Sequence, residues 1–270
     1  MNTPLEDDFN DILQKAAEGL SLSSADLITQ SGVDELSLKQ LFSGKFDESN
    51  LRKIAPLLDL RADALCLIAQ NAWHPQKHSL SGLWQISSTY KSMEVNAYLV
   101  KIPGTGEAIL FDTGTNALAI KERLAKESLT LSAIFLTHTH SDHVAALDEL
   151  IGSTGQPVIY APSLEPIDRA SPLNHKNEIN FNTLSIEARL THGHSRGGMS
   201  YIIKGLEAIL VAIVGDAIFA GSMGRGFISY KDALQSNKAQ ILSLPPSTVL
   251  CPGHGPMTSV EEELEHNPFF

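Results

Sequence analysis

The feature that most constrains the fold is a cluster of metal-ligand side chains directly after an apolar, strand-like run. The run AIFLT ends at Thr137, and the next six residues contain His138, His140, Asp142 and His143. Since side chains alternate along an extended chain, His138 and His140 can point the same way, and the other two then lie on the turn into a helix. Imidazole and carboxylate groups suit zinc, iron or manganese. Buried imidazoles need polar partners, so the cluster predicts a metal site rather than a piece of apolar core.

Three later segments repeat the pattern of a strand-like run followed by a ligand-type residue. His194 lies in the turn THGHSRGG, Asp216 follows AILVAIVG, and His254 lies in LCPGHGP after TVL. Functional groups of α/β sheets gather at strand ends, so these residues are expected to meet in one site. His192, two residues before His194, is expected to have a structural role. Neighbouring glycines allow close backbone approach and positive φ: Gly193, Gly215, Gly253 and Gly255.

Two regions of different texture divide the chain. From residue 80 onward, strand-like and helix-like segments alternate, which predicts an α/β domain over residues 80–270. Residues 1–72 instead predict a small all-α bundle, and the polar stretch 71–79 is the predicted linker. The bundle should contain five short helices, over residues 8–19, 24–30, 35–42, 50–58 and 59–70. Their N-caps are expected at Ser23 or Ser24, at Asp34, and at Asp47 or Ser49.

The composition is that of an ordinary soluble protein and excludes several other classes. Hydrophobic residues make up 43% of the 270 residues, and the net charge of −11 argues against a nucleic-acid or anionic-membrane surface. Cys66 and Cys251 are too few for a disulfide scaffold and are expected to be buried free thiols. The acidic N-terminus lacks a signal-peptide core, and the apolar run 208–214 is too short to span a bilayer. A cytoplasmic protein is therefore expected.

The ligand pattern resembles that of the metallo-β-lactamase-fold hydrolases. The similarity covers about residues 82–270 and is carried by His138-x-His140-x-Asp142-His143, followed by His194, Asp216 and His254. The segments GDAIFAGSMGR (215–225) and CPGHGP…HNPFF resemble the glyoxalase II-like branch. The resemblance implies an αββα sandwich of two sheets flanked by helices, with two metals at one edge and the all-α bundle in front of it.

The resemblance also implies a role for each ligand. It assigns His138, His140 and His194 to one metal, Asp142, His143 and His254 to a second, and Asp216 to both. Asp112, in LFDTG, matches a position that supports the ligands from behind. Two divalent metal ions are expected, zinc first, with iron or manganese as alternatives, because sites of histidine and aspartate accept all three.

Such a ligand set implies a binuclear hydrolase that acts on a small-molecule thioester, ester or lactone. Two metals about 3.5–4 Å apart can share a hydroxide that attacks the carbonyl group, and they stabilise the oxyanion that forms. A bound divalent metal lowers the pKa of water to about 7, so the hydroxide exists at neutral pH. Asp142 would orient the hydroxide as a catalytic residue. A metal-bound hydroxide needs no serine or cysteine nucleophile.

Some positions differ from those of the relatives and restrict the range of expected substrates. Asp216 stands where many β-lactamases of this fold carry cysteine, and His140 stands where the flavodiiron branch carries glutamate, so neither activity is expected. The basic residue that often precedes the terminal N-P-F is missing in EEELEHNPFF, which does not favour a glutathione thioester. Arg196 and Arg225 are the candidates to bind an anionic group of the substrate.

The N-terminal bundle resembles the lambda-repressor-like helix-turn-helix domains over residues 7–70, with Gly32 at the turn and Gly44 closing the third helix. Its net charge is negative, and the helix in the recognition position begins with Asp34 and Glu35, which would face phosphates. Since phosphate contacts supply most of the affinity for DNA, nucleic-acid binding is not expected. A packing or dimerisation module, or a lid beside the active site, is favoured, and a homo-oligomer stays open.

Two other functions stay open. One is a mononuclear iron persulfide dioxygenase, which shares the fold and in which Asp142 and His254 would be idle. The other is a regulator whose metal domain senses a ligand while the bundle binds DNA. Oxygen-dependent activity with iron would favour the first alternative. Affinity for duplex DNA at low salt would favour the second.

Overall fold

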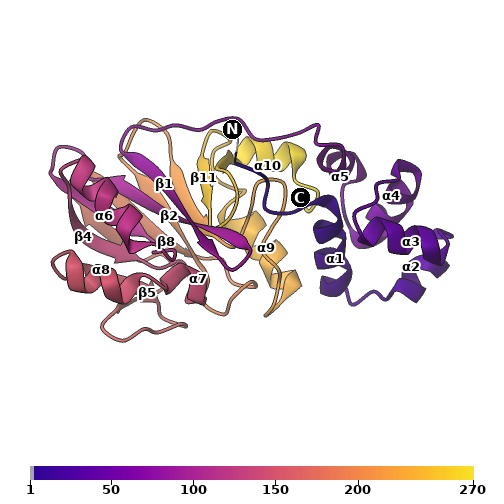
Figure 1. Ribbon diagram of the computed structural model, residues 1–270, viewed down its shortest axis with the longest axis horizontal. Helices are drawn as coiled ribbons and strands as arrows, with labels where there is room; N and C mark the ends of the chain where they lie inside the picture. Colours follow the sequence, from indigo (N-terminus) through magenta and orange to yellow (C-terminus); the bar gives the residue numbers. More distant parts are fainter. Residues whose placement is uncertain (1–2) are drawn as a thin grey trace.

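The computed structural model describes residues 3–270 and has two parts, a β-sandwich flanked by helices and a helical bundle at one end of it (Figure 1). The bundle, called the helical module below, contains α1 (Phe9–Gly19), α2 (Ser24–Ser31), α3 (Glu35–Phe42), α4 (Glu48–Ile54), a 3-10 helix (Ala55–Leu58) and α5 (Ala62–Ala69). The predicted fold class, an α/β sandwich preceded by an all-α bundle, is confirmed.

The sandwich consists of two six-stranded sheets, and the chain completes the first sheet before it enters the second. The first sheet runs in chain order: β1 (Leu83–Tyr90), β2 (Met93–Lys101), β3 (Glu107–Phe111), β4 (Thr130–Phe135), β5 (Val158–Pro162) and β6 (Ser171–Leu173). The second sheet has the order β12-β11-β10-β9-β8-β7: β7 (Glu178–Phe181), β8 (Leu184–Leu190), β9 (Met199–Lys204), β10 (Val211–Gly215), β11 (Val249–Pro252) and β12 (Thr258–Ser259).

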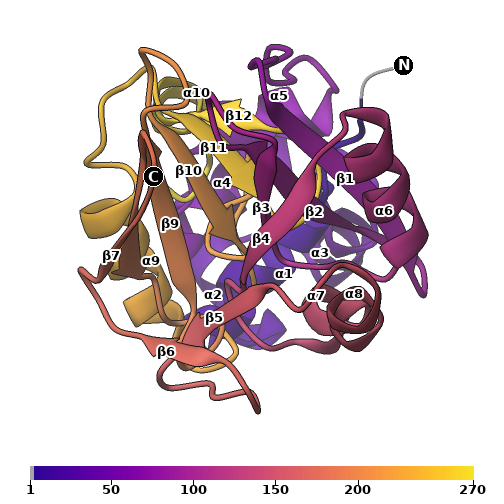
Figure 2. The same cartoon turned by 90° about the vertical axis from the view of Figure 1, so that its left-hand side faces the viewer.

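Apolar side chains fill the space between the sheets and the space under the flanking helices. Strand β2 shows the reason, because its side chains alternate: Tyr98 and Val100 lie between the sheets, whereas Ala97 and Leu99 lie on the outer face. Helices α6 (Ala117–Lys126) and α8 (Leu147–Ser153) cover that outer face (Figure 2). On the second sheet, α9 (Tyr230–Gln240) and α10 (Val260–His266) take the same position. The sandwich therefore has four layers, two sheets in the middle and a layer of helices on each outer face.

The helices of the module begin at the caps that the sequence predicts. The side chains of Ser23, Asp34 and Asp47 each accept a hydrogen bond from the backbone N–H three residues later, at 3.2, 3.0 and 2.9 Å. These bonds satisfy N–H groups that have no partner inside the helix. Gly32 adopts a φ of +68° between α2 and α3, as a turn there requires.

Two predicted helices of the module are shorter than expected. The helix predicted over 50–58 ends at Ile54 and continues as a 3-10 helix, because Pro56 lacks the N–H that the next α-helical turn needs. The helix predicted over 59–70 begins at Ala62, because Asp59 turns the chain with a φ of +54°. The short strands β6 and β12 were not predicted, since three-residue and two-residue strands show no alternation that a sequence could reveal.

The helical module shares its apolar core with the sandwich part. Met223, Tyr230, Ala233 and Phe269 belong to the same cluster as the inner side chains of α1 and α5. Figure 1 shows α1 and α5 nearest the sandwich and α2 to α4 farther away. The predicted boundaries at residues 72 and 80 stay a prediction. No helix within residues 3–270 combines the length and the apolar character that a membrane span needs.

Candidate metal centre

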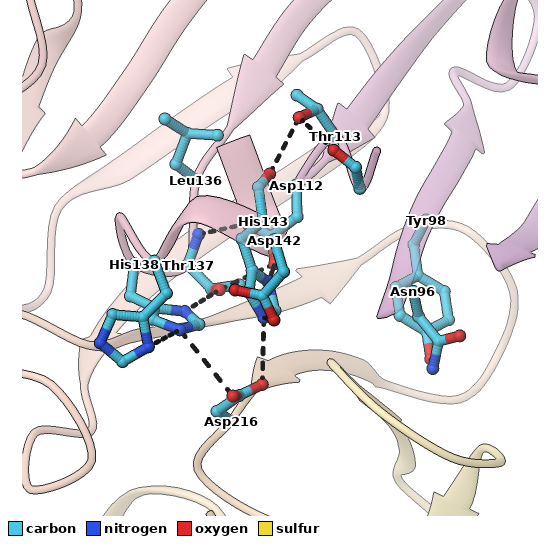
Figure 3. Close-up of polar contacts among 12 residues, drawn as sticks. Asn96, Tyr98, Asp112, Thr113, Leu136, Thr137, His138, Asp142, His143 and Asp216 are labelled. Carbon is cyan, nitrogen blue, oxygen red and sulfur yellow. Dashed lines mark hydrogen bonds and ion pairs between the residues drawn. The ribbon is translucent and has the colours of Figure 1, made fainter. Parts of the chain in front are cut away.

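The ligand-type side chains come from the ends of strands in both sheets. His138 and His140 lie on the loop after β4, and α7 (Ser141–Val144) carries Asp142 and His143. Figure 3 shows Asp216, on the loop after β10, facing His138 and His143 from the other sheet. His194 follows β8, and His254 follows β11. The structure therefore brings together all seven residues that the sequence singled out, in one group of four and one group of three.

The first group comprises His138, His140, His194 and Asp216. The Nδ1 atom of His140 lies 3.1 Å from Nε2 of His138 and 3.0 Å from Nε2 of His194. Oδ2 of Asp216 lies 3.3 Å from Nε2 of His194 and 3.9 Å from Nε2 of His138. Three ring nitrogens and one carboxylate oxygen thus converge on one small volume.

The second group comprises Asp142, His143 and His254, all buried. Oδ2 of Asp142 lies 3.5 Å from Nε2 of His254 and 3.8 Å from Nε2 of His143. Asp216 reaches this group too, because its Oδ1 lies 3.2 Å from Nε2 of His143 and its Oδ2 lies 3.5 Å from Nε2 of His254. The Asp216 carboxylate therefore lies between the two groups.

In four of the histidines, Nδ1 points away from the ligand groups and contacts a fixed partner. This atom is called the outer nitrogen below, and its partner the outer partner. Nδ1 of His143 faces Oδ2 of Asp112 at 2.8 Å, and Nδ1 of His254 faces the carbonyl oxygen of Glu94 at 2.6 Å. Nδ1 of His138 faces the Thr137 hydroxyl at 3.0 Å, and Nδ1 of His194 faces the carbonyl oxygen of Arg225 at 2.9 Å. Such outer partners orient the rings of metal-binding histidines and leave the other nitrogen free for the metal.

Nε2 of His143 and Oδ1 of Asp216 are buried and lie 3.2 Å apart, but neither makes a hydrogen bond within residues 3–270. Burial would lower the pKa of His143, but the carboxylates of Asp216 and Asp112 outweigh burial and raise that pKa to about 10. The same competition, with Asp216 and Asp142 opposing burial, raises the pKa of His254 to about 11. The carboxylates therefore favour positive charge at this side of the centre, and its nitrogen and oxygen donors fit divalent metals.

Gly253 allows the two sheets to approach at the centre. A Cβ atom on this residue would overlap Oδ1 of Asp216 and would lie 2.7 Å from Cε1 of His143. Of the four glycines singled out in the sequence, Gly193, Gly215 and Gly255 have the expected positive φ. Gly253 does not, so close approach alone explains its small size.

Comparison with known proteins decides the family. The sequence profile described as Metallo-beta-lactamase superfamily matches residues 92–254, a range that contains every residue of both groups. The chain belongs to the metallo-beta-lactamase superfamily. It is 31% identical over 200 residues to the probable metallo-hydrolase YqgX of Bacillus subtilis (strain 168), which covers 66% of this chain and 92% of that protein.

Two further proteins are similar to this chain. The hydroxyacylglutathione hydrolase of Tolumonas auensis is 30% identical over 159 residues, and the match covers 58% of this chain but only 60% of that enzyme. The solved structure of TTHA1623 in a di-iron-bound form superposes with a TM-score of 0.57 at 28% identity, over 68% of this chain and 100% of that chain. These relatives and the ligand groups identify the protein as a metal-dependent hydrolase, as the sequence predicts.

A groove opens beside the first group of this superfamily member. Its volume is about 350 Å³, and its wall contains His140 and His194. Three large apolar side chains of the same wall are unusually exposed: Leu164 by 53%, Phe227 by 65% and Ile228 by 58%. The Phe227 ring lies 5.4 Å from the ring of His194, between ring centres. Exposed apolar side chains that gather in a hollow are typical of a binding site.

The remaining residues singled out in the sequence lie around the centre. Arg196 is exposed and lines the groove. The guanidinium group of Arg225 is paired with Glu18 of α1, so a substrate anion would have to compete with that carboxylate. His192 faces Asp232 at 3.9 Å, outside both ligand groups. Cys66 and Cys251 are free and buried, as expected.

The sequence analysis did not identify Glu165, which makes hydrogen bonds to the two loops that carry His140 and His194. Its Oε2 accepts hydrogen bonds from the backbone N–H and the hydroxyl of Thr139, at 2.9 and 3.0 Å, and its Oε1 accepts one from the N–H of Gly197 at 2.6 Å. Thr139 adjoins His140, and Gly197 lies on the loop of His194. Glu165 stands alone in the loop after β5, and no spacing in the chain relates it to the ligands.

Proposed function

We propose that the protein is a binuclear metal-dependent hydrolase that acts on a small-molecule thioester, ester or lactone. One observation carries the proposal: the buried Asp216 carboxylate lies between a group of three histidines and the group of Asp142, His143 and His254, within 3.9 Å of members of both. A mononuclear site would need only the first group, and nothing would then explain why the second is assembled and buried. We take zinc as the metal, with iron or manganese as alternatives.

The metals and the residues around them would have different roles in the reaction. Divalent metals bound in this centre supply Lewis acidity toward a carbonyl oxygen and lower the pKa of water. Asp142 would accept a hydrogen bond from the attacking water and so orient it toward the carbonyl carbon. Asp112 and Thr137 would hold His143 and His138 in place, since hydrogen bonds already fix their outer nitrogens.

The groove supports a substrate that combines an apolar group with an anionic one. Leu164, Phe227 and Ile228 offer apolar surface next to the ligands, and Arg196 offers a positive charge on the same wall. Burial of an apolar group there would contribute about 25 cal/mol for each Å² removed from water. A substrate with a long apolar acyl chain would bury more of this surface than a substrate with a short acyl group would.

Replacing Phe227 with alanine tests the groove. We expect KM for a thioester with an apolar acyl chain to rise about tenfold while kcat changes less than about twofold, because the contact forms equally in the ground state and the transition state. An acetyl thioester should show little change. Leu36→Ala, an equally exposed apolar side chain on α3 of the helical module, is the control. A fall in kcat with an unchanged KM would contradict this role of Phe227.

Metal content per chain is the first test of the proposed function. Protein purified without added metal should contain about two equivalents by plasma mass spectrometry, in line with a two-metal site. It should hydrolyse at least one member of a thioester and lactone panel, lose that activity to a chelator and regain it with zinc. About one equivalent of iron, with oxygen-dependent activity, would instead support the persulfide dioxygenase alternative. A folded protein without metal would contradict both.

A further inference from the structure

The segment that follows Asp216 is packed against two ligands of the metal centre. A Cβ atom on Gly224 would overlap the carbonyl oxygen of Asp216 and would lie 3.0 Å from Nδ1 of His194. The next residue, Arg225, contacts the same His194 nitrogen through its carbonyl oxygen at 2.9 Å. The segment Ser222–Arg225, called the support loop below, therefore fixes the orientation of His194 and the backbone at Asp216.

The opposite side of the support loop is held by the helical module. Nζ of Lys15, on α1, donates a hydrogen bond to the carbonyl oxygen of Met223 at 2.9 Å. The Ser222 hydroxyl donates to Oδ2 of Asp7 at 2.5 Å, and Lys15 and Asp7 form an ion pair with each other. Both charged side chains are only 9% exposed. Glu18, also on α1, pairs with the side chain of Arg225.

The same part of the module approaches the second ligand group. Nζ of Lys15 lies 5.1 Å from the centre of the Phe219 ring, and that ring lies 5.5 Å from the ring of His254. Glu6, next to Asp7 in the chain, places Oε2 4.0 Å from Nδ1 of His254. Side chains from the second half of α1 contact the support loop beside His194, and Glu6 before the helix approaches His254 of the second group.

Stability alone is a weak reason for a buried ion pair at this place. A lysine and an aspartate that leave water lose hydration energy, and well-packed apolar side chains would often stabilise the fold as much or more. A buried ion pair does fix the positions of the groups around it, because its charges find their partners in only one arrangement. Here that arrangement includes the carbonyl oxygen of Met223 and the hydroxyl of Ser222.

We propose that the helical module is a working part of the metal centre, in which Lys15 and Asp7 are positioning residues that hold the support loop against His194 and Asp216. The proposal rests on the metal site described under the proposed function. It gives the module a role that DNA binding or a loose linkage would not require. The matched region of the superfamily begins only at residue 92, so this support comes from outside it.

The variant Lys15→Met removes the charge and the hydrogen bond to Met223 but keeps most of the buried stem. We expect full-length Lys15→Met to lose zinc to a chromogenic chelator about tenfold faster than the wild type does. This is the lower end of the ten- to hundredfold that loss of an outer partner costs in metal affinity. Release is measured well below the unfolding midpoint of each variant. Cobalt-substituted protein should also show a changed visible spectrum, which a general loss of stability would not produce.

Lys53→Met is the matched control, because Lys53 is exposed on α4. If Lys15→Met does not fold, Ser222→Ala removes only the hydroxyl that donates to Asp7 and should accelerate release to a smaller degree. Release at the control rate with an unchanged cobalt spectrum, in Lys15→Met or in Ser222→Ala, would overturn the proposal even if the melting temperature falls. A wild-type protein that binds no metal would instead overturn the proposed function.

Discussion

Replacing Asp216 with asparagine is expected to lower kcat/KM for the best thioester or lactone substrate by more than about a hundredfold and to reduce bound metal by about one equivalent. The amide keeps the size of the side chain but loses the charge that both ligand groups share. Loss of even an outer partner of a metal ligand costs about ten- to a hundredfold in affinity or activity, so a shared ligand should cost more.

The charge of Asp216 also matters before any metal binds. Burial would raise the pKa of this carboxyl group, but His254 and His143 beside it hold the pKa well below its usual range. In Asp216→Asn those two histidines lose the carboxylate that attracts a cation to them. Asp232→Asn, on the surface of α9, is the control, because Asp232 lies outside both ligand groups. Full activity and full metal content in Asp216→Asn would contradict the two-metal scheme.

Asp112→Asn is expected to have the second largest effect, with metal affinity reduced by about ten- to a hundredfold. The buried Asp112 carboxylate accepts hydrogen bonds from the N–H of Thr137 at 2.7 Å and from its hydroxyl at 2.8 Å, and it contacts Nδ1 of His143 at 2.8 Å. An asparagine amide can accept at one of its ends only, so its NH₂ group would face a donor. A buried donor left without an acceptor costs about 1–3 kcal/mol.

Competition with a chelator of known affinity measures the metal affinity of the variant. Chemical unfolding of the metal-free protein measures its free energy of unfolding. Asp148→Asn, an exposed acid at the start of α8, serves as control. The two measurements separate the roles of Asp112. If stability falls while metal affinity stays at the control value, Asp112 only maintains the fold, and its assignment as a support of the ligands is wrong.

The spacing of residues along the chain was enough to predict the metal centre as a set of residues. His138, His140, Asp142 and His143 are close in sequence, so their proximity in space is a local property of one strand end. His194, Asp216 and His254 could be added because each follows an apolar strand, and strand ends meet at the edge of a sandwich. The α/β architecture followed from the alternation of strand-like and helix-like segments along the chain.

The outer partners of the ligands were mostly beyond sequence analysis. The carbonyl oxygens of Glu94 and Arg225 contact His254 and His194, and any residue type supplies a carbonyl oxygen, so no letter in the sequence marks them. Glu165 is a similar case, because its partners are backbone N–H groups on two separate loops. Such contacts depend on how loops pack, and loop packing is not encoded in any short-range pattern.

The helical module shows most clearly the difference between features set by short segments and contacts set by the complete fold. Local signals such as the caps at Ser23, Asp34 and Asp47 predicted where α2, α3 and α4 begin, because a cap acts within one turn. The buried contact of Lys15 and Asp7 with the support loop joins residues more than 200 positions apart in the chain. Secondary structure and ligand identity are thus properties of short segments, and a sequence displays them. The joining of the module to the metal centre arises from packing between distant segments, which depends on the complete fold.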